Sequence, residues 1–205
     1  MLCGGALEAG ANAVVLFSDD FKDNSLDTVK WNARSGGLTE SGGTLNIVYS
    51  GATGQAESRY GSIKQDMTIE TIIKFDSVSL NSAEELLANL WTSANGYITT
   101  VTLGIGGAYN GASITYACGA YKNNLLVTAV VGTYYTLKMQ FDFTTGFMNC
   151  FIDGVQKMHV AMATALPSIV LANIAKISYG SDNGGSVPSP SPMHLNNFVV
   201  YAGLA

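Results

Sequence analysis

Aromatic side chains are the residues of this 205-residue chain best suited to binding chemistry. Five of those in its middle third have flat rings with a polar group, which could stack on the face of a sugar ring. For any single ring the alternative is packing in the core or anchoring a loop. The sequence therefore predicts a carbohydrate-binding surface that comprises Trp91, Tyr97, Tyr109, Tyr116 and Tyr121.

Groups that could act as acid, base or nucleophile form no recognisable set. Glu84 and Glu85 are adjacent, so on a strand they would point to opposite faces, and Asp66 and Glu70 lack a third carboxylate. The chain has no Gly-x-Ser-x-Gly sequence to present a serine nucleophile. Two histidines and three cysteines have no zinc-site spacing. We therefore expect no catalytic residues, no metal and no cofactor.

The composition predicts a folded acidic chain. Hydrophobic residues make up 47% and charged residues 12%, and the net charge is −5. Binding of nucleic acid is not expected, because it needs clustered Lys and Arg. The first basic residue is Lys22 and no apolar run reaches membrane length, so we expect neither a secretory signal nor membrane association, and synthesis in the cytoplasm. Cys118 and Cys150 are either buried thiols or a disulfide pair.

Alternation of apolar and polar residues predicts an all-β chain. Residues 66–76 and 134–143 alternate over their whole length with one exception, as half-buried antiparallel strands do. Asp153-Gly154 predicts a tight turn between two strands, and at most one helical turn is expected after Ser82. Further strands are predicted at 13–18, 29–33, 44–50, 57–61, 86–93, 97–104, 112–118, 124–130, 147–153, 155–161, 168–172, 174–180 and 195–202.

Three segments carry a resemblance to a known fold family. They are Phe17–Trp31, with its Ser-Leu-Asp turn before Lys-Trp, the pair Tyr135–Phe143 and Phe151–Val155, and the closing Leu195–Tyr201. In this order they resemble the concanavalin A-like lectin/glucanase (laminin-G-like) domains. The resemblance implies a two-sheet antiparallel jelly-roll sandwich over residues 13–205, preceded by an N-terminal arm, 1–12. It also implies that residues 13–18 pair with 195–202, which would cover a sheet edge.

The catalytic sequence patterns of that family's enzymes are absent from this chain. Its glucanases carry Glu-x-Asp-x-x-Glu on one strand, which is absent here. Its alginate lyases often use a Gln-x-His strand, whereas His159 follows Lys157-Met158 and His194 lies just after Pro192. We therefore expect that the chain is not an enzyme. Calcium held near the chain ends, as in several sandwich families, is an alternative to the expected absence of metal, with Asp19 and Asp20 as ligands.

The middle of the chain is nearly free of charge. Residues 86–137 contain one charged residue, Lys122, and residues 183–205 contain none. Monomers usually place Lys and Glu on outward strand positions, so an uncharged surface favours packing against identical subunits or a larger protein shell. The segment 184–192, with three alternate prolines, is a surface loop or, alternatively, a docking peptide.

Three functions remain open from the sequence. The first is a structural or attachment component of a large assembly, since the chain resembles phage virion decoration and fibre proteins in fold and composition; it would then reside on the virion or particle surface. The second is a lectin-like carbohydrate-binding module that contacts surface glycan. The third is a degraded or unrecognised glycan hydrolase or lyase. Fold by itself does not choose among them.

Overall fold

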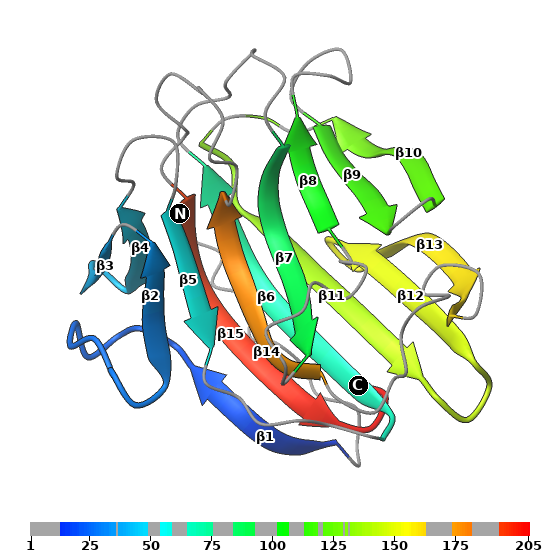
Figure 1. The fold of residues 1–205 in the computed structure, drawn as a ribbon, viewed down its shortest axis with the longest axis horizontal. Helices are drawn as coiled ribbons and strands as arrows, with labels where there is room; N and C mark the ends of the chain where they lie inside the picture. The colour runs from blue at the N-terminus through cyan, green and yellow to red at the C-terminus, as the bar shows by residue number, and fades with distance from the viewer. Residues whose placement is uncertain are drawn as a thin grey trace.

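The computed structural model describes residues 13–35, 37–48, 54–58, 65–75, 84–92, 102–106, 113–118, 121–128, 130, 132–162, 174–181 and 193–205. Within these residues the elements are strands, arranged in two antiparallel sheets that face each other (Figure 1). The predicted all-β sandwich is confirmed.

One sheet has eight strands. Its order is β13 (Val155–Ala161), β12 (Phe147–Ile152), β11 (Tyr135–Asp142), β6 (Met67–Phe75), β15 (Met193–Ala202), β4 (Thr44–Val48) and β3 (Gly37–Ser41), and β1 (Val14–Asp19) also pairs with β15. The other sheet has seven strands. Its order is β10 (Tyr121–Thr128), β9 (Ser113–Cys118), β8 (Thr102–Gly106), β7 (Glu84–Thr92), β14 (Ile174–Ser181), β5 (Gly54–Ser58) and β2 (Trp31–Ser35).

The first and last strands pair as the sequence predicted. The antiparallel register of β1 and β15 runs from Val14 opposite Ala202 to Asp19 opposite Phe198. β15 also pairs along its length with β6, so the closing strand lies inside the eight-stranded sheet. The two ends of the described chain are therefore held in one sheet.

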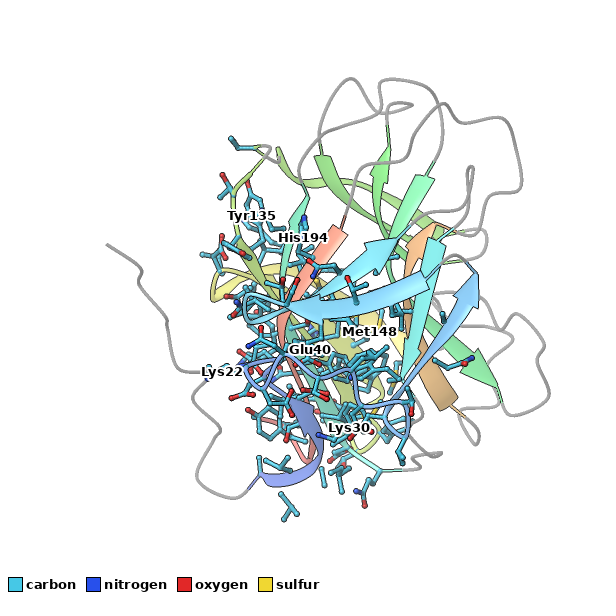
Figure 2. The ribbon with its side chains drawn as sticks, turned by 90° about the vertical axis from the view of Figure 1, so that its left-hand side faces the viewer. Lys22, Lys30, Glu40, Tyr135, Met148 and His194 are labelled. Atoms are coloured by element: carbon cyan, nitrogen blue, oxygen red, sulfur yellow. The ribbon has the colours of Figure 1, made fainter. Side chains whose placement is uncertain are left out.

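The alternation of β11 determines which face of the eight-stranded sheet enters the core. Tyr135, Leu137, Met139 and Phe141 are buried, while the residues between them are partly exposed. β12 continues the same inner face with Met148, which is fully buried and is labelled in Figure 2. Each strand of this hairpin region thus has one apolar face toward the other sheet and one face toward solvent.

Aromatic side chains join the two sheets at one end of the sandwich. Trp31 of β2 is 1% exposed, and its ring centroid lies 5.3 Å from that of Phe198 and 5.8 Å from that of Phe17. Phe21, from the loop after β1, lies 5.5 Å from the same indole. Trp31 Nε1 also donates a hydrogen bond to Asp19 Oδ2 at 2.8 Å.

Some expectations differ from the structure. β3 was not predicted, because the sequence Gly-Leu-Thr-Glu-Ser has one large apolar residue and no strand-like alternation. The limit of at most one helical turn after Ser82 agrees with the structure at Glu84 and Glu85, which already belong to β7. Cys150 is a free buried thiol, so it forms no disulfide with Cys118. The predicted arm 1–12 and strand 168–172 lie outside the described residues.

Residues that follow β15 pack back onto β6 through Thr68. The buried Thr68 hydroxyl donates to the carbonyl of Gly203 at 3.0 Å and accepts from the amide of Ala205 at 2.9 Å. Lys138 Nζ and Gln140 Nε2 donate to the carbonyl of Ala205 at 3.0 and 2.6 Å. The segment is therefore fixed across β6 and β11 by polar contacts.

We predict that Thr68→Val destabilises the protein by about 1–3 kcal/mol, because the isosteric side chain leaves two backbone groups without their partner. The free energy of unfolding in urea measures this. Thr136→Val on β11 is the control, since its partly exposed hydroxyl has no hydrogen bond to a described residue, and a change within about 0.5 kcal/mol is expected there. Equal effects of the two variants would contradict the prediction.

Candidate functional site

The aromatic residues predicted to bind sugar are placed only in part. Trp91 lies on β7 opposite Lys176, Tyr116 lies on β9, and Tyr121 begins β10. These three strands belong to the seven-stranded sheet. Tyr97 and Tyr109 lie outside the described residues. The aromatic surface therefore remains a prediction.

A groove with described side chains lies on the hairpin β12–β13. Figure 1 shows this hairpin at the edge of the eight-stranded sheet. It is open to solvent and has a volume of about 680 Å³. Among the described residues, the exposed side chains of its lining offer amide, imidazole and ammonium groups and no carboxylate. The lining residues are Asn149, Gln156, Lys157, Met158 and His159.

The tight turn that was predicted at Asp153-Gly154 forms this hairpin. Both residues have positive φ, 50° and 76°, as a two-residue turn of this kind requires. Asp153 Oδ1 also accepts a hydrogen bond from the Thr136 amide at 2.9 Å, which ties the turn to β11. The hairpin is therefore fixed at its tip and along its neighbouring strand.

A bulge brings the polar residues of β13 together. Gln156 is opposite Phe151 and Met158 is opposite Cys150, so Lys157 is an extra residue without a partner in the register. A bulge of this kind changes which residues face outward. Because of it, Gln156 and His159 are both exposed while Met158 is buried between them.

Asn149 holds both side chains in place. Gln156 Nε2 donates to Asn149 Oδ1 at 3.0 Å, and His159 Nδ1 lies 2.7 Å from the same oxygen. Because an amide oxygen only accepts, Nδ1 carries the hydrogen of the second bond. A neutral His159 then presents its Nε2 to solvent as an acceptor.

Aromatic rings flank these polar groups. Phe147 stacks on His159, with ring centroids 4.3 Å apart and planes 12° from parallel. Phe151 lies beneath Lys138 Nζ, which is 5.8 Å from the ring centroid. The outer face of the hairpin therefore offers donors, acceptors and apolar ring surface within a short span.

The sequence of β13 contains one signal for this site, which is a change in the spacing of its apolar residues. The apolar residues Val155, Met158 and Val160 change their spacing from three to two, which indicates a bulge. The Gln-x-His pattern does not pick out His159, because Gln156 lies three residues before it. Asn149 comes from another strand and gave no signal of its own.

The residues suggested for calcium serve other contacts. Asp19 accepts hydrogen bonds from the amide of Phe21 at 3.1 Å and from Trp31 Nε1 at 2.8 Å. Asp20 pairs with Lys22 at 2.9 Å. Among the described residues no group of three or more His, Cys, Asp or Glu is arranged to hold a metal.

Glu40 is an inward-facing carboxyl on the edge strand β3 (Figure 2). It lies opposite the buried Leu45 and is 8% exposed, and its oxygens have no hydrogen-bond partner among the described residues. Burial, together with the neighbouring carboxyl of Asp23 and the charge of Asp19, raises the pKa of Glu40 to about 7. The neutral, protonated form of Glu40 is therefore favoured in this position.

Comparison with known proteins shows likeness in fold. No family model and no curated protein matches the sequence. A sialidase is similar with a TM-score of 0.70 and 12% identity, over 92% of this chain and 18% of the sialidase, so this chain spans about a fifth of that enzyme. A carbohydrate esterase from the Shiga toxin-encoding bacteriophage phi24B is similar with a TM-score of 0.70 and 14% identity, over 94% and 100% of the two chains.

A third similar structure is a botulinum neurotoxin type C chain. It has a TM-score of 0.62 and 12% identity over 94% of this chain and 48% of the toxin chain. At such identities the likeness shows the fold alone. The resemblance to lectin and glucanase-like β-sandwiches, stated from the sequence, is confirmed at that level.

The expectation that the chain is not an enzyme is wrong. The sialidase and the carbohydrate esterase are enzymes, and this fold makes up 18% of the sialidase chain and the whole of the esterase chain. The expectation relied on missing sequence patterns of two enzyme branches, whereas the fold also occurs in other classes of carbohydrate-active enzyme.

We predict that the stability of the protein falls as the pH rises from about 4.5 to about 7. Below this window Glu40 is protonated in both the folded and the unfolded chain. Within it the unfolded chain releases the proton while the folded chain keeps it. This difference favours unfolding by up to about 3 kcal/mol. Glu40→Gln should remove this loss, so the melting temperature should change less between pH 5 and pH 8.

Asp20→Asn is the matched control, because it removes the same charge from an exposed carboxyl whose pKa the hydrogen bond from Lys22 lowers. It should leave the pH dependence of the melting temperature as it is in the unmodified protein. The prediction fails if Glu40→Gln and Asp20→Asn give the same curve.

Proposed function

We propose that the protein binds carbohydrate and that the groove on β12–β13 holds the sugar. The observation that carries the proposal is that Asn149 fixes Gln156 and His159 side by side in one open groove. Sugar hydroxyls both donate and accept hydrogen bonds, so fixed amide and imidazole groups suit them. The ring of Phe147 beside His159 offers apolar surface to the C–H face of a sugar.

Two of the similar structures support this proposal. The phage protein is described as a carbohydrate esterase, and the entry of neurotoxin type C into cells is described as dependent on two ganglioside molecules. Since the likeness reaches only the fold, the groove itself is the main support for the proposal.

A glycan array with the purified protein tests the proposal. We expect saturable binding to a defined set of glycans, and we expect the double variant Asn149→Ala/His159→Ala to weaken it by about tenfold or more, since each lost hydrogen bond is worth about 1 kcal/mol. His194→Gln is the control, because His194 Nδ1 lies 2.6 Å from Asn46 Oδ1 in a similar pair outside the groove. Melting temperatures confirm that the variants fold.

Trp91→Ala separates the groove from the aromatic surface predicted on the seven-stranded sheet. If Trp91→Ala abolishes binding and the groove variant does not, carbohydrate binding stands but its site lies with the predicted aromatic residues. If no glycan binds the unmodified protein, the proposed function is wrong.

We also propose that the protein functions within a larger assembly, such as the surface of a virion. Val14, Val15 and Leu16 are all exposed on β1, Val15 by 52%, and a run of exposed apolar residues on an edge strand favours pairing with another chain. The scarcity of charge in residues 86–137 supports association, and so does the likeness to a phage protein.

Light scattering at increasing protein concentration tests the association. We expect an oligomer that Val15→Lys shifts toward the monomer, because the ammonium group would have to be desolvated on pairing. Val29→Lys is the matched control, since Val29 is an exposed valine in the loop before β2. A monodisperse monomer at high concentration that also binds no particle would exclude this role.

A further inference from the structure

The groove has more free hydrogen-bond donors than acceptors. Asn149 Oδ1 already accepts from Gln156 and His159, so Asn149 is left with its amide N–H groups. Lys157 adds an ammonium group that can only donate. Among the described lining residues, the free side-chain acceptors that remain are the Gln156 carbonyl oxygen and Nε2 of a neutral His159.

Among the five lining residues, Lys157 carries a charge that a ligand can reach. It is exposed, and none of the five lining residues is acidic. Lys138, on the neighbouring part of this face, already donates to the carbonyl of Ala205 at 3.0 Å and lies opposite Glu70 in the register. The acidic groups nearest along the chain serve backbone amides: Asp153 accepts from Thr136, and Asp142 accepts from Thr145.

The bulge explains why this ammonium group lies at the groove. Lys157 is the extra residue of β13, between the exposed Gln156 and the buried Met158. In a regular strand, residues three positions apart point to opposite faces, so Gln156 and His159 share one face only because of the bulge at Lys157. The same local feature therefore gathers the amide and imidazole groups and adds a cation beside them.

We infer that the groove is specific for acidic glycans, in which an anionic group on the sugar binds Lys157 and the amide of Asn149. This inference rests on the carbohydrate-binding function proposed above. An anion accepts several hydrogen bonds and donates none, which matches the surplus of donors, and a charge-assisted bond is stronger than one between neutral groups. The net charge of −5 opposes the approach of an anion, but remote charges are screened beyond about 8 Å at physiological ionic strength, so the local lysine decides.

Paired probes with and without the anion test the inference by calorimetry. Oligogalacturonate is compared with its methyl ester, and dextran sulfate with dextran, so the two arms distinguish a sugar carboxylate from a sulfate ester. We expect at least one charged probe to bind about tenfold or more tighter than its neutral counterpart. Lys157→Gln should remove that preference, and Lys157→Arg should retain it.

Lys22→Gln is the matched control, because Lys22 is an exposed lysine on the loop after β1, labelled in Figure 2. It should leave the preference for charged probes unchanged. Binding of neutral probes that is as tight as binding of charged ones, or a preference that survives Lys157→Gln, overturns the inference but not the proposed function. Failure of all four probes, together with an empty glycan array, overturns both.

Discussion

Trp31, on β2 of the seven-stranded sheet, packs against aromatic side chains of the eight-stranded sheet, and the sandwich depends on this contact. Its indole packs against Phe17 and Phe198 at 5.8 and 5.3 Å, and its Nε1 donates to Asp19 at 2.8 Å. A large aromatic side chain buried at such a junction contributes several kcal/mol of apolar burial. Because Phe17 and Phe198 lie on the first and last strands, the contact also fixes the pairing of β1 with β15.

The same division of strands into two faces allows a polar groove on the hairpin β12–β13. Met148, Cys150 and Met158 enter the core, where burial raises the pKa of the Cys150 thiol to about 12 and so keeps it neutral. Asn149 and His159 occupy the alternate positions toward solvent. Since core and groove use different faces of the same backbone, the packed interior positions the polar side chains without taking part in binding.

Local patterns account for what could be predicted from the sequence. Alternation indicated most strands, as in residues 134–143, and Asp153-Gly154 indicated its turn because aspartate and glycine tolerate positive φ. The edge strand β3 escaped prediction because it contributes few apolar side chains. The groove escaped it because Asn149 and His159 meet only through cross-strand pairing, and the effect of the extra residue Lys157 depends on which partner β13 has.

The extra residue in β13 also has a consequence for how this surface could change over evolution. Insertions in a strand usually displace every later side chain, but here the inward residues after it, Met158 and Val160, are still buried. Asn149, Gln156, Lys157 and His159 can therefore be exchanged without altering the interior. A library randomised at these four positions would vary ligand choice on a constant scaffold, which makes the hairpin suitable for engineered recognition.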